Sequence, residues 1–136
     1  MNKWFVSLFV SLAALMSATT ASANEFATLR ADMTAARESL VTMLTNKDKR
    51  GADHQKVVKD TADAATARLS KMKAPAGKEA QFKELVETWA AFKKTREDEL
   101  VPAILAGKDA EARKIAGGIQ KDRYTKCQEL LSALGG

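Results

Sequence analysis

The residue types that carry metal or haem chemistry are scarce in this sequence. Its 136 residues include one histidine, His54, and one cysteine, Cys127. Covalently attached haem requires a Cys-x-x-Cys-His motif, and a di-iron bundle requires Glu-x-x-His on two helices. One cysteine and one histidine satisfy neither pattern, and a zinc site fails on the same count. We therefore expect no metal or other cofactor, and we expect His54 to face solvent in the first turn of a helix.

Enzymatic catalysis is also not expected. Cys127 has no histidine placed to activate it as a nucleophile. Its neighbours Tyr124, Leu130 and Leu131 predict a small buried hydrophobic residue, although an unpaired cysteine in an oxidising compartment could instead form an intermolecular disulfide. The acidic pair Asp98 and Glu99 lies on a charge-rich, exposed helix, where nothing would raise a carboxylate pKa.

Binding chemistry is the remaining class, and arginines are its candidates. Arg96, Glu99 and Arg123 fall near positions that a packed helix would bury. One interpretation is an ion pair between helices, for example Glu99 with Arg123. The other is a ligand site in which arginine forks the carboxylate or phosphate of a small anion. The candidate ligand-binding residues are thus Arg96 and Arg123, and Arg30 and Arg37 either join them or remain solvated.

Four helices must position these residues. Alanine, lysine and glutamate dominate the sequence, and apolar residues recur at alternating spacings of three and four, which predicts heptad seams. The expected helices span about 25–46, 52–73, 78 to the stop at Gly107, and 109–134. The seams are Phe26, Leu29, Met33, Ala36, Leu40 and Met43; Val58, Ala62, Ala65, Leu69 and Met72; Phe82, Leu85, Trp89 and Phe92; and Ile115, Ile119, Cys127, Leu130 and Leu134.

The last two helices carry the irregular features. Pro102 either kinks the third helix or ends it near Leu100 and begins a new turn. Asp109 is expected to cap the start of the fourth helix. Gly117 and Gly118 lower helix propensity in the middle of that helix. Short connections between long helices predict an all-α, antiparallel up-down-up-down four-helix bundle over residues 24–136.

The first 23 residues have the pattern of a secretory signal peptide. Lys3 provides the positive start, an apolar run extends from Trp4 to Met16, and Ala21-Ser22-Ala23 forms the cleavage site. The apolar run is shorter than the roughly 20 residues that span a bilayer. We expect cleavage after Ala23 and a periplasmic or secreted protein, with an uncleaved inner-membrane signal anchor as the alternative. The net charge of +5 is interleaved with acidic residues, so no nucleic-acid partner is expected.

Three short motifs, taken together in their order along the chain, resemble those of a known family. They are Leu29-Arg30 in the first helix, the W-x-x-[F/Y] pattern of Trp89 and Phe92, and LAGKDAEA over residues 105–112, which opens the fourth helix. With them, residues 25–134 resemble the periplasmic four-helix-bundle ligand-binding domain of methyl-accepting chemotaxis receptors. The resemblance implies a sensor of small molecules that often dimerises. No second membrane span, HAMP linker or signalling hairpin follows Leu134, so we expect a stand-alone soluble version.

Three functions therefore stay open. The first is an exported binding module of the chemoreceptor type. Its partner is either a small molecule, for which an anion is one candidate, or an inner-membrane receptor or kinase. It would dimerise through the first helix, whose seam is the most regular. The second is a cytochrome-like or other cofactor-carrying bundle with rearranged ligands. The third is a structural protein that holds a partner helix in an apolar groove.

Overall fold

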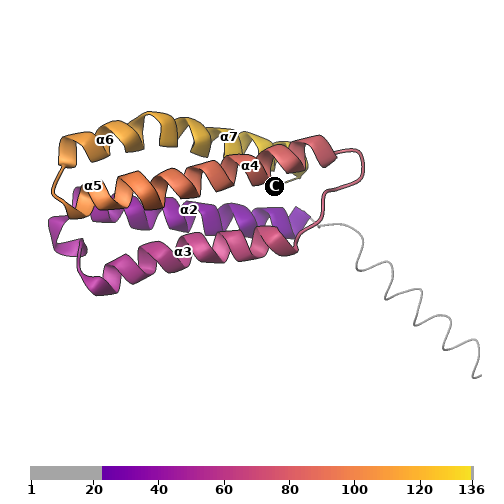
Figure 1. Cartoon of the computed structure of the whole chain (residues 1–136). Coiled ribbons are helices and arrows are strands. Elements are labelled where there is room, and N and C mark those ends of the chain that lie inside the picture. Colours follow the sequence, from indigo (N-terminus) through magenta and orange to yellow (C-terminus); the bar gives the residue numbers. More distant parts are fainter. Residues whose placement is uncertain (1–22, 136) are drawn as a thin grey trace, which may run out of the picture.

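The computed structural model describes residues 23–135, and every regular element in this range is helical, as expected. The predicted signal peptide lies, except for Ala23, outside the described residues. Four rods lie side by side (Figure 1). The first two rods are α2 (Ala23–Thr45) and α3 (Ala52–Lys71), joined through the short turn η1 (Lys47–Lys49). The third consists of α4 (Glu79–Thr95), η2 (Arg96–Leu100) and α5 (Val101–Leu105), and the fourth of α6 (Asp109–Gly117) and α7 (Ile119–Leu134).

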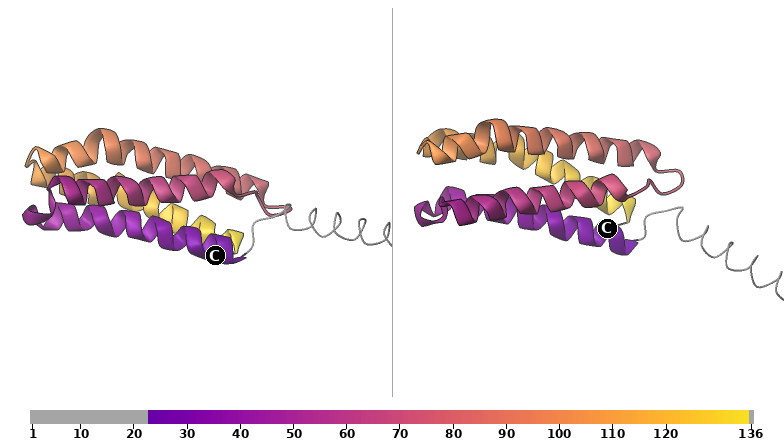
Figure 2. Two further views of the ribbon diagram at one scale, coloured as in Figure 1. Left: turned by 90° about the horizontal axis from the view of Figure 1, so that it is seen from below. Right: turned by 60° about the horizontal axis from the view of Figure 1, so that its bottom comes forward.

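The rods pack most extensively in two pairs. The contacts are densest between α2 and α3 and between α4 and α7, and they are sparser between α3 and α4. Figure 2 shows the η1 turn and the α5–α6 turn at one end of the molecule, and the α3–α4 connection together with the end of α7 at the other. Among the helices of the described range, none combines the length and apolar character that crossing a membrane requires.

The first three predicted seams form the core. Every seam residue of α2 and α3 is buried, and so are Leu85, Trp89 and Phe92 of α4, while Phe82 packs against the core from its edge. The stop at Gly107 is also confirmed. Its φ of +74° lets the Lys108 N–H reach the carbonyl of Ala103 at 2.9 Å, which closes the end of α5.

The fourth seam is predicted only in part. Gly118 separates α6 from α7, so the helical phase changes between them. As a result Ile119 is 51% exposed, contrary to expectation, and Gln120 turns inward with only 2% exposed. Asp109 does not cap α6 as predicted. Lys108 holds that position, and Asp109 instead accepts a 3.1 Å hydrogen bond from Arg50.

The third rod changes its winding just before Pro102. Arg96 to Leu100 form one π-helical turn, in which the Val101 N–H bonds the carbonyl of Arg96. Pro102 lacks an N–H and its ring clashes with the carbonyl four residues earlier, so an α-helix cannot continue through it without adjustment. The wider turn takes up this misfit, and the chain continues without a break into α5, with Pro102 in its first turn. The expectation that the helix ends near Leu100 is therefore wrong, because Thr95, Leu100 and Val101 all keep helical φ and ψ.

Three buried polar residues divide the core into two clusters. Ser39, Arg96 and Gln120, which we call the polar layer, are buried from α2, η2 and α7. One cluster, which includes Phe26, Trp89 and Leu131, lies on one side of this layer. The other lies toward the η1 end and contains Leu40, Met43, Leu44, Val58, Leu100, Ala103, Ile104 and Ala112.

The two adjacent glycines are expected to respond differently to alanine. A Cβ at Gly118 would lie 2.8 Å from the Lys114 carbonyl oxygen, whereas a Cβ at Gly117 meets nothing within 4 Å. Gly118→Ala should therefore lower the free energy of unfolding by about 1–3 kcal/mol. Gly117→Ala should leave it unchanged or raise it by up to about 1 kcal/mol. Urea denaturation followed by circular dichroism measures both, and equal effects would contradict this account of the break.

Candidate functional site

The centre of the candidate site is the buried side chain of Arg96. Only 1% of Arg96 is exposed, and no fully buried side chain of the described residues is larger. Its Nη1 donates a 2.8 Å hydrogen bond to the carbonyl of Ala36 in α2, and its Nη2 a 2.7 Å bond to that of Val58 in α3. Burial lowers the pKa of Arg96 to about 10, which leaves the guanidinium charged at neutral pH. The third rod thus places a positive charge between the first two.

No carboxylate of the described residues lies within ion-pair distance of this charge. Glu97 and Asp63 are near enough to favour the charged form of Arg96. Their ion pairs, however, go to Lys93, at 2.9 Å from Glu97 and 3.2 Å from Asp63. The charge of Arg96 is therefore held by carbonyl dipoles and remains available to a ligand.

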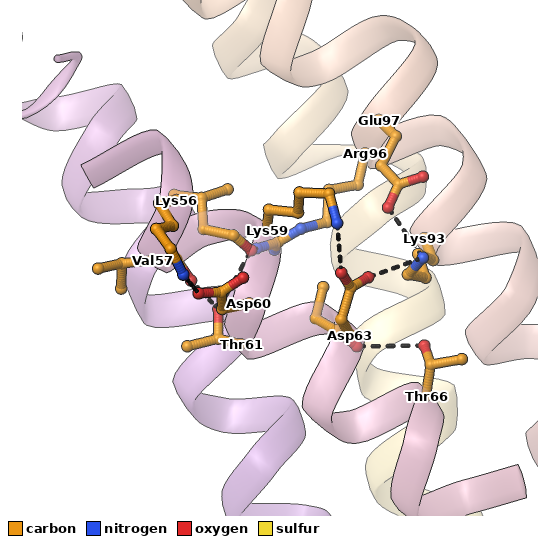
Figure 3. A network of polar contacts seen from close by, with 12 residues as sticks. Lys56, Val57, Lys59, Asp60, Thr61, Asp63, Thr66, Lys93, Arg96 and Glu97 are labelled. Atoms are coloured by element: carbon orange, nitrogen blue, oxygen red, sulfur yellow. Dashed lines mark hydrogen bonds and ion pairs between the residues drawn. The ribbon is translucent and has the colours of Figure 1, made fainter. Parts of the chain in front are cut away.

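The acidic residues near Arg96 belong to a network between α3 and α4 (Figure 3). Asp63 accepts from Lys59 at 2.6 Å as well as from Lys93, and Lys56 pairs with Asp60 one turn away. The hydrogen bond from Lys59, with help from Lys93, lowers the pKa of Asp63. The acidic side chains of the network are occupied by lysines, and the Lys93–Asp63 pair ties α4 to α3 without neutralising Arg96.

A cavity of about 300 Å³ reaches Arg96 from between α2 and α6. Three arginines line it: Arg37 from α2, Arg96 from η2 and Arg113 from α6. Gln120 adds a polar group, and the remaining side chains are mostly apolar. These are Leu40, Val41, Leu44, Phe92, Leu100 and Ala116, and Gly117 completes the lining. Arginine keeps its proton at neutral pH, so the cavity offers charge-assisted hydrogen bonds to an anion and not proton transfer.

Arg37 is one of the two predicted arginines that the cavity brings together. It is half-buried, and its guanidinium carbon lies 5.0 Å from the centre of the Tyr124 ring, a cation–π contact. The Tyr124 hydroxyl is in turn 3.0 Å from the Thr34 hydroxyl, which fixes the ring. Tyr124 thus holds Arg37 at the wall of the cavity. Arg37 and Arg96 therefore line one cavity, and their role in binding stays a prediction.

Arg123 lies outside the cavity and supports it. Its Nη1 donates to Thr95 at 2.6 Å and to the side-chain oxygen of Gln120 at 3.1 Å. Gln120 then donates to the carbonyl of Phe92 at 2.8 Å. The expected ion pair of Arg123 with Glu99 is wrong for the described residues, because Glu99 is exposed on η2 while Arg123 turns to the α4 face.

Arg30 also lies away from the cavity. Its guanidinium bonds the side chain and the carbonyl of Gln128, and donates to the Ser132 hydroxyl at 2.8 Å. It therefore ties the start of α2 to the end of α7 and is not simply solvated. Arg113 was not predicted, because it is exposed and stands on no seam. Its only sequence signal is its position one turn before the Gly117-Gly118 pair.

The two residues with reactive side chains lie elsewhere. Cys127 is buried, as expected, and burial raises its thiol pKa to about 12. His54 is half-buried and not simply solvent-facing, with its Nε2 2.8 Å from the carbonyl oxygen of Ser39. Within residues 23–135 no group of three or more His, Cys, Asp or Glu side chains is arranged to hold a metal ion.

Comparison with known proteins finds no matching family model, no matching curated protein and no matching solved structure. The functional conclusion therefore rests on the geometry of the cavity.

Replacing Arg96 distinguishes a stabilising residue from a functional one. Arg96→Met keeps an apolar stem but removes a buried charge, so the free energy of unfolding should be unchanged or up to about 4 kcal/mol higher. Arg96→Ala leaves a void and should be less stable than Arg96→Met by about 2–5 kcal/mol. Urea denaturation measures both. A large loss of stability in Arg96→Met would show that Arg96 serves the fold and not a ligand.

Proposed function

We propose that this protein is an exported, non-enzymatic binding module for a small anionic ligand. One observation carries the proposal: a cavity lined by three arginines reaches a buried guanidinium that no carboxylate of the described residues neutralises. Burying a charge costs free energy, and among the described residues Arg96 donates hydrogen bonds to two carbonyl oxygens, while Glu97 and Asp63 act on it only from beyond ion-pair distance. An anion in the cavity would add the missing opposite charge.

The polar groups of the cavity favour binding over catalysis. Its guanidinium groups stay protonated, and the Gln120 side chain is held by Phe92 and Arg123. Neither group accepts a proton at neutral pH, so the cavity has no general base of its own. This arrangement supports the expectation that the protein is not an enzyme.

We infer an antiparallel up-down-up-down topology for the four rods. The contacts at both ends support it. Arg30 joins the start of α2 to the end of α7 through Ser132. At the other end Arg50 donates to the carbonyls of Met43 and Leu44, which close α2, and to Asp109, which opens α6. A four-helix bundle is also what the resemblance to chemoreceptor sensor domains implies.

A signalling role is proposed on the same resemblance. In this proposal the module pairs with an inner-membrane receptor or kinase and reports the bound anion. The seam of α2, from Phe26 to Met43, is buried within its own chain. A homodimer through the first helix would therefore use the opposite, more polar face of α2, where Ala31, Ala35 and Glu38 are exposed.

A groove between α3 and α4 supports a second candidate function. A hollow of about 370 Å³ lies between Leu69 and Ser70 of α3 and Val86 and Trp89 of α4. Val86 is exposed at its edge. This is the kind of surface that holds a partner helix by its apolar face, as in the structural interaction protein considered above.

Export predicts a defined mature N-terminus. When the full chain is expressed in a Gram-negative host, cleavage after Ala23 should release a periplasmic protein that begins at Asn24. Intact-mass spectrometry of the periplasmic fraction measures this. A full-length chain retained in the membrane fraction would support the signal-anchor alternative instead.

Anion binding predicts a difference between two neighbouring residues of α6. Arg113 lines the cavity and Lys114 does not, although both are exposed. Calorimetry with sulfate, phosphate, acetate and hexanoate should detect binding of at least one anion. Arg113→Ala should weaken the affinity for that anion about tenfold, which corresponds to the lower end of the free energy of a hydrogen bond to a charged group. Lys114→Ala should leave it unchanged. If none of the four anions binds, or if both variants weaken binding equally, the proposed site is wrong.

A further inference from the structure

The walls of the arginine cavity are largely apolar, and this restricts the kind of anion that fits. Leu40, Leu44, Phe92 and Leu100 line the cavity and are also buried members of the two core clusters. Val41 adds a half-buried branched side chain. The exposed parts of the four buried side chains are small, but together with Val41 they form an apolar lining, which a hydrocarbon body would cover and an inorganic anion would not. The wall therefore favours an amphipathic ligand.

The three arginines are not equivalent, and their differences favour one carboxylate. Arg96 already donates one hydrogen bond to the carbonyl of Ala36 and one to the carbonyl of Val58. Arg37 is held by the Tyr124 ring, and Arg113 is exposed. Arg37 and Arg113 are thus the residues able to donate hydrogen bonds to an anionic head group. The buried charge of Arg96 attracts the anion electrostatically. A second charged group on the ligand would have to lie against the apolar wall.

The volume of the cavity sets the size of the ligand. The 300 Å³ of space corresponds to roughly ten water-sized volumes of about 30 Å³ each. With about two or three of these for the carboxylate, roughly seven or eight remain, which is room for a hydrocarbon body of up to about eight carbons. A body of fewer than about four carbons would fill only about half of that space or less.

We infer that the ligand is a monocarboxylate with an apolar body of about four to eight carbons. The carboxylate is bound by Arg37 and Arg113, and the hydrocarbon lies against Leu40, Val41, Leu44 and Phe92. This inference rests on the proposed anion-binding function and names its ligand class.

The test is a series of straight-chain carboxylates from acetate to dodecanoate, measured by calorimetry on the exported chain. Affinity should rise by up to about fourfold for each added methylene, the value for burial of a CH₂ group. The rise should stop near octanoate, when the cavity is full. Hexanol, which has the hydrocarbon body without the charge, should bind at least tenfold more weakly than hexanoate.

A matched pair of variants tests whether the hydrocarbon body of the ligand lies against Val41. Val41→Thr keeps the shape of the side chain but replaces one methyl group at the cavity wall with a hydroxyl. It should weaken hexanoate severalfold and leave acetate unchanged. Val57→Thr makes the same change on the exposed face of α3, outside the cavity, and should alter neither.

The possible outcomes distinguish the inferred ligand class from the proposed anion-binding function. If sulfate or phosphate binds through Arg113 and affinity does not grow with chain length, the ligand class is overturned while the anion-binding function stands. If hexanol binds as tightly as hexanoate, recognition of a carboxylate is overturned. If no anion binds, both the inference and the proposed function fall.

Discussion

The constraint that organises the middle of the bundle is the buried charge of Arg96, which two hydrogen bonds hold against the carbonyls of Ala36 and Val58. These bonds let the third rod place a charge in the interior without a carboxylate partner. A core that was apolar throughout would not need them, because the seams on either side pack well. The buried polar side chains of Ser39, Arg96 and Gln120 divide the core into two clusters. The hydrogen bonds of Arg96 also fix the third rod lengthwise against α2 and α3.

The two departures from regular helix lie beside this charge. The π turn delivers Arg96 and Leu100 to the cavity, and Gly117, at the break between α6 and α7, lines the same cavity. Gly117 has no side chain, and a Cβ there would meet nothing within 4 Å, so the lining is open at this residue. Helix distortion of this kind is frequent where a helix contributes to function rather than to packing.

How much could be predicted from the sequence differs between the rods. The seams of α2 and α3 repeat at three and four without interruption, so periodicity alone identifies the buried residues. In the fourth rod the same reasoning places Ile119 inside, and it fails because Gly118 resets the helical phase and turns Gln120 inward. Helix propensity identifies Gly117-Gly118 as a weak point of the predicted helix. It does not predict how far the helix that follows is rotated relative to the one before.

The candidate site shows the same division. Arg96 stands out in the sequence because a charge occupies a seam position, and its burial is confirmed. Arg123 stands out for a similar reason, and Arg30 is a candidate from the first helix. Both bond elsewhere, Arg30 to α7 and Arg123 to α4, and neither lines the cavity. Arg113 gives no such signal, since only the return of the chain at Gly107 brings α6 beside α2. Which arginines meet is a property of tertiary packing and not of spacing along one helix.

The depth of Cys127 protects the protein in an oxidising environment. Burial raises the pKa of the Cys127 thiol to about 12, so the thiol stays protonated at neutral pH, whereas the thiolate is the nucleophile in exchange with oxidised glutathione or with a second cysteine. The sulfur is also enclosed by the core. A disulfide with another molecule would therefore require the bundle to open first.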